Sequence, residues 1–398
     1  MRRWDRFIVA MFLCAISIPG VATLFGVDGA PADENRELAP PPVVDARWES
    51  LRALPDAFTK YFEDHFAFRA PLVHAQADIR LRALGVSPST AVITGKDGWL
   101  FYADDGAVED YAVAPEMSQS DLETWSWTLQ DVQDWLAGQG IAYAFVVAPD
   151  KHVIYPEMMP ASVHRLREQS RIDQFVAYLR AHSTVNVVDL RPALLEAKQR
   201  ERIYHRTDTH WNDRGALVAY QQIIVSLRVE GLTPLPRAAF VDAEIQTPGL
   251  DLAGMLGLKN RLPEQDLRLV PRTPRRARIV EPVNPQPHGI YDRLATEQAD
   301  TRLPRAVIYR DSFMSALIPF LSEHFSRALY LWEPDVNPHA IADERPNVVI
   351  QEWVGRRLGP KLPYNFVADQ GLRSNAAASP AQSAVGATSR SPSPAPAD

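Results

Sequence analysis

Apolar residues recur along the chain in two alternating patterns. Between residues 118 and 140 they are spaced three and four apart, as on one face of an amphipathic helix: Leu122, Trp125, Leu129, Val132 and Leu136. Short apolar runs are typical of buried strands, and we expect these at 143–148, 185–188, 306–309, 328–332 and 347–352. Helices are expected at 171–181, 216–227 and 313–325. The alternation predicts an α/β fold with a mostly parallel sheet flanked by helices.

Other segments depart from this alternation. Residues 48–84 have a mainly helical pattern, and 95–102 read as a turn that feeds a strand. Residues 234–304 are rich in Pro, Arg and Asp with little periodicity, so we interpret them as an irregular insertion and a candidate cover for the functional site. From residue 374 onward Ala, Ser and Pro dominate, which predicts a disordered tail. The folded domain is therefore expected over 47–370, with the tail at 371–398.

The amino terminus carries a membrane signal. Three arginines within the first six residues precede an uncharged run from Phe7 to Val27, long enough to cross a bilayer as a helix. The basic flank predicts that the amino terminus stays in the cytoplasm. We expect a transmembrane anchor at 1–27, a proline-rich linker at 28–46, and export of the rest, in a bacterium to the periplasm. Pro19-Gly20 interrupts the run, so a cleaved secretory signal is the alternative.

Composition excludes several classes of function. Hydrophobic residues make up 46% and charged residues 23% of the 398 residues, which predicts a substantial core. The net charge of -7 and the lack of a basic run argue against nucleic-acid binding. Cys14 is the only cysteine and lies in the first apolar run, so an intrachain disulfide, a cysteine nucleophile and a cysteine metal site are all excluded.

Two short stretches supply the parts of an activated serine. Asp208-Thr209-His210-Trp211 and Asp311-Ser312-Phe313 each stand where a strand-like run gives way to a helix-like one, where α/β proteins collect functional side chains. Ser312 is expected at a helix N-terminus, where unpaired N–H groups, its own included, favour a developing oxyanion. In extended backbone Asp208 and His210 share a face, so Asp208 can orient the imidazole that takes the serine's proton.

Plainer interpretations remain open for the same residues. Ser312 is also a favoured helix N-cap, and Asp208 with His210 is also an ordinary surface or capping pair. A metal site is the competing functional interpretation, because His205, Asp208, His210 and Asp213 form a cluster of possible ligands. The helical H-E-x-x-H spacing is absent, and we expect no metal.

These motifs resemble those of the alginate O-acetyltransferase AlgX/AlgJ group of SGNH-hydrolase-like proteins. Supporting matches lie at 95–101, at Lys151 with 155–157, and at 348–352, so that the resemblance spans about residues 47–360. It implies a periplasmic domain that moves acetyl groups onto an exopolysaccharide without a cofactor, with Ser312 as nucleophile, His210 as base and Asp208 as orienting acid. It also implies that a multispanning inner-membrane acyltransferase supplies the acetyl group.

The resemblance has departures, and further site residues are assigned with it. Arg310 stands two residues before the serine, where related sequences commonly have Gly, and no carbohydrate-binding module follows the domain. Substrate-binding or oxyanion candidates are Lys151, Tyr155, Arg310 and Trp211. Four tryptophans either pack in the core, the favoured interpretation, or line a groove: Trp99, Trp211, Trp332 and Trp353. Alternatives to transfer are a secreted carbohydrate esterase with the same triad and a noncatalytic polysaccharide-binding or assembly protein.

Overall fold

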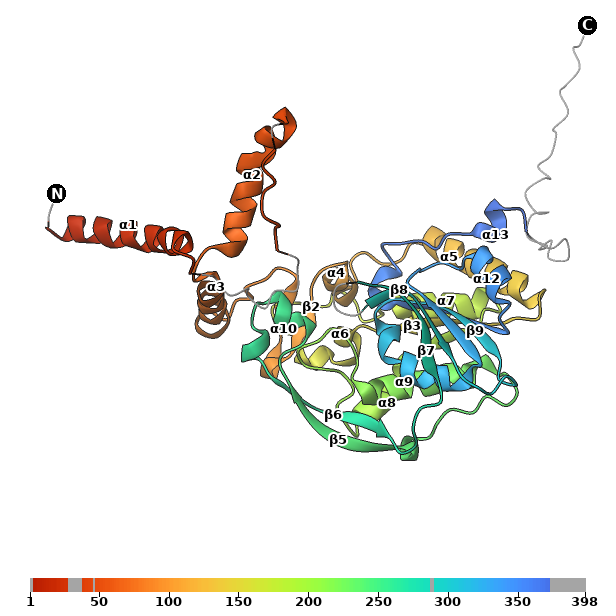
Figure 1. The fold of residues 1–398 in the computed structure, drawn as a ribbon. Helices are drawn as coiled ribbons and strands as arrows, with labels where there is room; N and C mark the ends of the chain where they lie inside the picture. Colours follow the sequence, from red (N-terminus) through yellow and green to blue (C-terminus); the bar gives the residue numbers. More distant parts are fainter. Residues whose placement is uncertain (1–2, 28–37, 46, 287–289, 373–398) are drawn as a thin grey trace, which may run out of the picture.

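A computed structural model describes residues 3–27, 38–45, 47–286 and 290–372 of the chain. Most of the expected linker and nearly all of the expected tail lie outside these residues. The described part is a folded body with two helices, α1 (Arg3–Leu24) and α2 (Trp48–His65), that project away from it (Figure 1).

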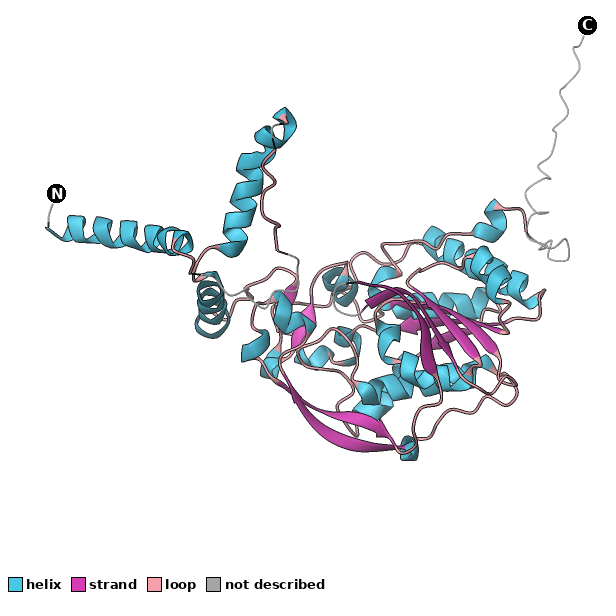
Figure 2. Ribbon diagram, in the orientation of Figure 1, coloured by secondary structure: helices cyan, strands magenta, loops and turns pink. Residues whose placement is uncertain are grey.

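Figure 2 shows the main sheet in magenta among the helices that flank it. The sheet has seven strands, in the order β4-β3-β11-β9-β10-β8-β7. Its first five strands run parallel, and β8 (Ile290–Glu297) is antiparallel to β10. Strand β7 (Arg278–Gln286) is antiparallel to β8 and therefore runs in the direction of the first five. The parallel strands are β3 (Ala142–Ala148), β4 (Val187–Asp189), β9 (Arg305–Tyr309), β10 (Arg327–Leu331) and β11 (Val348–Val354). These match the five expected strands, and the predicted mostly parallel sheet is confirmed.

Helices cover both faces of this sheet (Figure 1). One face packs against α5 (Gln119–Ala137), α7 (Arg171–His182), α12 (Pro338–Glu344) and α13 (Phe366–Asp369). The other packs against α8 (Arg191–Lys198), α9 (Asp213–Leu227) and α11 (Ile318–Leu321). Strand β3 shows the division, because Phe145 and Val147 point to the first face while Ala144 and Val146 point to the second.

Smaller elements surround the sheet. The expected turn and strand at 95–102 form the antiparallel pair β1 (Val92–Thr94) and β2 (Leu100–Tyr102). Two short helices that the periodicity did not show are α4 (Ala107–Ala112) and α6 (Lys151–Ile154). The amphipathic helix α5 begins with the capping box of Ser118 and Asp121.

The expectation of an irregular insertion at 234–304 is wrong. This segment contains the hairpin β5 (Phe240–Thr247) and β6 (Glu264–Pro271), the short helix α10 (Asp251–Met255), and the edge strands β7 (Arg278–Gln286) and β8 (Ile290–Glu297). Strand β5 is largely exposed and carries no clear apolar alternation. In β7, Pro282 and Pro285 obscure the strand pattern, and an edge strand is where a sheet tolerates proline.

The expected continuous helix at 313–325 is also wrong. The segment is divided into a 3-10 turn (Phe313–Ala316), α11 (Ile318–Leu321) and a second 3-10 turn (Ser322–His324). Pro319 stands at the start of α11, because a proline lacks the N–H that a longer helix would use at that position. Ser312 therefore does not stand at the N-terminus of a long α-helix.

The amino-terminal region is helical. Helix α1 (Arg3–Leu24) continues through Pro19, and residues Trp4–Thr23 are long and apolar enough to cross a membrane. Helices α2 (Trp48–His65) and α3 (Arg69–Asp78) confirm the mainly helical pattern expected there. A hydrogen bond of 2.7 Å from the Ala67 N–H to Thr23 Oγ1 joins the end of α1 to the α2–α3 turn.

Replacement of Trp125 measures how much burial in the core contributes to the free energy of unfolding. Its fully buried ring packs against Phe145, Phe175 and Trp353, while Trp127 on the same helix is 63% exposed. We expect Trp125→Ala to lower the free energy of unfolding by about 3–5 kcal/mol, and Trp127→Ala by about 0.5 kcal/mol at most. Urea unfolding of the full chain, followed by circular dichroism, measures both. Equal losses would contradict the assignment of Trp125 to the core.

Candidate active site

Asp208 and His210 lie in a turn that leads into α9. An isolated bridge between Tyr204 and Trp211 closes the loop of residues 205–210, which we call the histidine loop. As expected, the loop precedes α9, whose N-cap Asn212 accepts from the N–H groups of the first turn. Gly215 in that turn approaches the segment before the loop closely, because a Cβ there would lie 2.2 Å from the Ile203 carbonyl oxygen. The expectation that a regular strand precedes Asp208 is wrong.

The structure brings Ser312, His210 and Asp208 into one hydrogen-bonded row. His210 Nδ1 lies 2.7 Å from Asp208 Oδ1, and His210 Nε2 lies 2.7 Å from Ser312 Oγ. The His210 N–H also donates to Asp208 Oδ1, at 2.9 Å. Ser312 and His210 are 102 positions apart in the sequence. Their expected proximity is confirmed, and their catalytic roles remain predictions.

The charges of the row fix its protonation. Burial alone would raise the pKa of Asp208, but the charge and hydrogen bonds of His210 outweigh burial, so the pKa of Asp208 lies below its usual range. Burial likewise disfavours the charged form of His210, yet the Asp208 carboxylate raises the pKa of this imidazole above its usual value. Asp208 remains ionised and accepts the Nδ1–H, which leaves the Nε2 lone pair facing the serine hydroxyl.

Lys151 fixes the backbone of the histidine loop through hydrogen bonds. Its ammonium group donates to three carbonyl oxygens, those of His205 and Arg206 at 3.1 Å and that of Asp208 at 2.5 Å. Burial lowers the pKa of Lys151 to about 8. Because these carbonyls use all three of its N–H donors, Lys151 positions the loop rather than contacting an oxyanion.

Two carboxylates from the 234–304 segment complete this support, and sequence reasoning missed both. Asp251 in α10 accepts from the Thr209 N–H and hydroxyl, each at 2.8 Å. Glu264 in β6 accepts from Thr207 N at 2.8 Å, Thr207 Oγ1 at 2.5 Å and the Arg206 N–H at 2.7 Å. Burial and the neighbouring Asp208 charge raise the pKa of Asp251 to about 6. No spacing in the sequence links these acids to the histidine loop.

The serine side of the site is fixed through Asp311. Its carboxylate accepts from the N–H groups of Phe313 at 2.9 Å and Val354 at 3.1 Å, which ties the segment to the end of β11. Trp211 donates from Nε1 to the Phe313 carbonyl at 3.1 Å and so joins the two halves of the site. Among described residues the Ser312 N–H has no acceptor, so it is available to an oxyanion.

The other candidates lie around the site rather than in it. Arg310 is buried, donates to the Asp311 carbonyl and the Ser315 hydroxyl, and stacks over Trp332 at 4.8 Å. The Tyr155 hydroxyl accepts from the Ile203 N–H at 3.1 Å, behind the histidine loop. Of the four tryptophans, the three buried ones favour the core interpretation: Trp99, Trp211 and Trp353.

The four-residue metal cluster expected as an alternative does not form. His205 pairs with Glu264 and Asp266, and although burial opposes it, these carboxylates raise the pKa of His205 to about 9. Asp213 accepts from the Leu269 N–H instead. Asp208 and His210 share a group of possible ligands with Asp251, but Asp208 and Ser312 already engage both imidazole nitrogens of His210.

Comparison with known proteins places the chain in a family. The family described as "SGNH hydrolase-like domain, acetyltransferase AlgX" matches residues 92–288. The chain is 32% identical over 173 residues to "Probable alginate O-acetylase AlgJ" of Pseudomonas aeruginosa, covering 42% of this chain and 41% of that protein. It is 31% identical over 225 residues to the protein of the same name from Pseudomonas syringae pv. tomato, covering 52% and 54%. The chain belongs to the AlgX/AlgJ-like family.

These matches cover only part of each curated relative. The chain spans about half the length of the curated AlgX/AlgJ-like relatives it matches, with 41% and 54% of the two proteins covered. The solved structure of Bacillus cereus PatB1 superposes with a TM-score of 0.50 at 17% identity, over 67% of this chain and 97% of that one. This likeness supports the SGNH-hydrolase-like fold alone.

Asp251 should set the pH range in which this AlgX/AlgJ-like site works. Its negative charge helps to raise the pKa of His210, so Asp251→Asn should lower that pKa and move the acid limb of kcat/KM to lower pH. The amide can still accept the Thr209 N–H bond. Hydrolysis of p-nitrophenyl acetate across pH 4.5–8.5 measures the limb (about two units either side of an ordinary imidazole). Asp242→Asn, on exposed β5, is the matched control, and an unmoved limb in Asp251→Asn would contradict the assignment.

Proposed function

We propose that the chain is a periplasm-facing O-acetyltransferase that moves acetyl groups onto hydroxyls of an alginate-like exopolysaccharide. The observation that carries the proposal is the row of hydrogen bonds from Asp208 through His210 to Ser312. The names of the curated relatives, alginate O-acetylases, supply the reaction class and the substrate class. The proposed roles are nucleophile for Ser312, general base and acid for His210, and orienting carboxylate for Asp208.

The first half of the reaction forms an acetyl-serine. His210 Nε2 takes the hydroxyl proton as Ser312 Oγ attacks the carbonyl carbon of the acetyl donor. The Ser312 N–H donates to the resulting oxyanion, and one such donor is typically worth about 3–4 kcal/mol of barrier. When the bond to the leaving group breaks, the imidazolium returns its proton to that group. Asp208 stabilises the imidazolium throughout.

The second half repeats the chemistry with a sugar hydroxyl. His210, now neutral, takes the proton of the acceptor hydroxyl as its oxygen attacks the acetyl carbonyl. Collapse of the tetrahedral intermediate breaks the bond to Ser312 Oγ, which recovers its proton from the imidazolium. Water in place of the sugar would release acetate, so this geometry alone also suits a carbohydrate esterase. The names of the relatives favour transfer.

The amino-terminal helices support a membrane location. Helix α1 is proposed as a single-pass inner-membrane anchor that holds the domain beside the multispanning acyltransferase that donates acetyl groups. The exposed apolar residues of α2 follow a three-and-four spacing along one face: Trp48, Leu51, Phe58 and Phe62. Thr23 at the end of α1 bonds to the α2–α3 turn, so the carboxyl-terminal end of this face lies beside the end of the proposed anchor.

Acylation of Ser312 is the decisive test of the mechanism. Incubation with p-nitrophenyl acetate should add one acetyl group to the peptide that contains Ser312, as read by mass spectrometry. Ser312→Ala should remove the label and lower turnover by about 10³-fold or more, because the nucleophile is gone. Ser315→Ala, which removes the next serine along the chain, should keep the label. Undiminished turnover in Ser312→Ala would end the proposal.

Product analysis separates transferase from esterase. With an acetyl donor and a short alginate oligosaccharide, the wild-type protein should yield acetylated sugar, detected by mass. Free acetate as the sole product would favour the esterase.

Location is tested independently of chemistry. The full chain should sediment with membranes and retain residues 1–27 in its intact mass, because the apolar run of α1 is long enough to remain in the bilayer. Protease added to spheroplasts should digest the domain. A mature protein that begins near residue 20–30 and fractionates with the soluble periplasm would favour the cleaved signal instead.

A further inference from the structure

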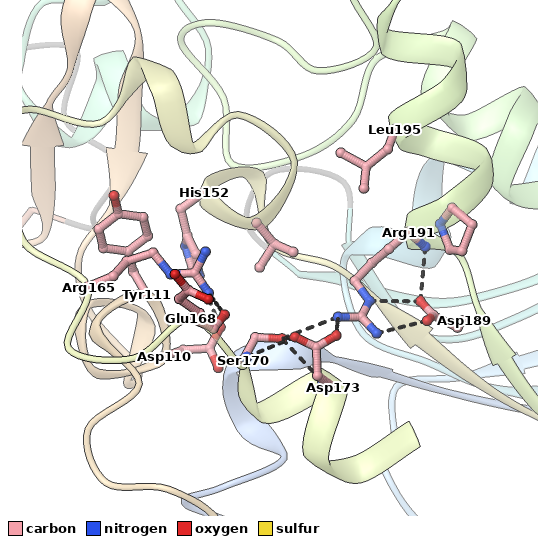
Figure 3. Close-up of a pocket in the computed structure, with 12 residues that line it drawn as sticks. Asp110, Tyr111, His152, Arg165, Glu168, Ser170, Asp173, Asp189, Arg191 and Leu195 are labelled. Atoms are coloured by element: carbon pink, nitrogen blue, oxygen red, sulfur yellow. Dashed lines mark hydrogen bonds and ion pairs between the residues drawn. The ribbon is translucent and has the colours of Figure 1, made fainter. Parts of the chain in front are cut away.

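A cavity of about 490 Å³ opens beside the candidate active site and takes no part in the triad (Figure 3). Its lining includes Tyr111 from α4, His152 from α6, Arg191 from α8, and the loop residues Arg165 and Glu168. This volume lies within the usual range for small-molecule sites, about 300–1,000 Å³.

The cavity lies along the same edge of the sheet as Ser312. Helix α6 follows the carboxyl end of β3, and Arg191 follows that of β4, just as Ser312 follows β9. In the order β4-β3-β11-β9 these ends are two and three strands from β9, which corresponds to about 10–15 Å at ordinary strand spacing. Helix α6 connects the two places, since Lys151 holds the histidine loop and the next residue, His152, lines the cavity.

His152 lines the cavity and has an unused hydrogen-bond acceptor. Its Nε2 lies 3.0 Å from Asp110 Oδ2, and both side chains are more than nine-tenths buried. With the Nε2–H donated to Asp110, the Nδ1 lone pair has no partner among the described residues. Buried polar groups are normally hydrogen-bonded, so a nitrogen held this way at a cavity wall points to a ligand that donates to it.

On the opposite wall, the positive charge of Arg191 is already neutralised by neighbouring carboxylates. The Arg191 guanidinium donates to Asp173 Oδ1 at 2.5 Å and to Asp189 Oδ2 at 2.8 Å, and it also reaches the Ser170 hydroxyl (Figure 3). This network forms a fixed polar surface. At the exposed rim Arg165 donates one N–H to the Glu168 carbonyl, at 2.7 Å, and its guanidinium forms no other hydrogen bond with a described residue.

A metal ion fits the cavity poorly. Asp110, Asp150 and His152 bring possible ligand atoms within 4.8 Å of one another. However, both oxygens of Asp150 are taken by Arg356, through its backbone N–H at 3.0 Å and its guanidinium at 2.6 Å. A guanidinium bound to one of the three candidate ligands opposes a second cation there.

We infer that this cavity binds one sugar unit of the acceptor polysaccharide while another unit of the same polysaccharide chain lies at Ser312. The inference rests on the proposed function and names where the acceptor is held. A sugar hydroxyl supplies the donor that His152 Nδ1 needs, and the Tyr111 ring offers an apolar face for a pyranose ring. An acidic sugar would also pair its carboxylate with Arg165.

Binding without chemistry tests the inference. In the Ser312→Ala chain, calorimetric titration with hexameric oligomannuronate and with the neutral cellohexaose compares two sugar probes. Adding His152→Gln should weaken both by roughly tenfold, because each loses a hydrogen bond of about 1–1.5 kcal/mol. Adding Arg165→Gln, an exposed position that does not endanger folding, should weaken only the acidic hexamer by a similar factor. Arg167→Gln, two residues along the same loop and outside the cavity lining, should leave both affinities as they are.

The outcomes separate this inference from the proposed function. Unchanged hexamer affinity in both the His152 and the Arg165 variants, with Ser312 of the wild type still becoming acetylated, overturns the inference alone. If the His152 variant loses binding and also unfolds at a lower temperature than the parent chain, its loss of binding is not informative. The affinity of the Arg165→Gln variant for the acidic hexamer then decides. If Ser312 never takes an acetyl group but binding depends on the cavity, the cavity stands and the protein binds polysaccharide without transferring acetyl groups.

Discussion

The position of one imidazole between two segments 102 residues apart is the interaction on which the site depends. The histidine loop that carries it has neither helix nor regular strand, so its backbone groups need other hydrogen-bond partners. Ionic side chains provide them: Lys151 takes three carbonyls, and Asp251 and Glu264 take the N–H groups of Arg206, Thr207 and Thr209. A loop held by charges of both signs keeps His210 in reach of Ser312 without a strand beneath it.

The same supports set the electrostatics of the base. Asp208, Asp251 and Asp311 all favour the protonated form of His210, against a burial that disfavours it. The net effect raises the pKa of His210, which strengthens it as a base and stabilises the imidazolium that each half reaction forms, while its neutral form becomes scarcer as the pH falls. The raised pKa of Asp251 has a related origin, since its burial and the neighbouring Asp208 charge both oppose a second negative charge there.

The parts of the fold that the sequence predicts are those whose side chains are sorted by burial. The strands of the parallel sheet are mostly apolar, although β11 also contains Gln351 and Glu352, and α5 has an apolar stripe with a capping box. These patterns can therefore be recognised in the sequence. The β5–β6 hairpin is largely exposed and β7 contains prolines, so neither shows the period of a strand. The helix expected at 313–325 is broken at Pro319, although its apolar spacing is helical. Ser312, His210 and Asp208 can be recognised in the sequence as the parts of one triad. Asp251 and Glu264 resemble ordinary solvent-exposed acids in the sequence, and only the folded β5–β6 region places them at the histidine loop.

The placement of these supports bears on how transfer can outrun hydrolysis. The described residues of the 234–304 segment bond to the histidine loop through the carboxylates of Asp251, Glu264 and Asp266 and through backbone N–H groups near α10. These contacts hold the loop rather than cover the serine. The triad itself remains partly exposed, with the His210 side chain at 25%. Water therefore has access, and selectivity must come from holding the acceptor hydroxyl in attack geometry, where an oriented reactant gains a large effective concentration over a free one. A polymer anchored a few strands away, at a cavity on the same sheet edge, would supply that orientation through binding energy remote from the reacting atoms. A single free sugar could not occupy both places, so the design favours chains over monomers.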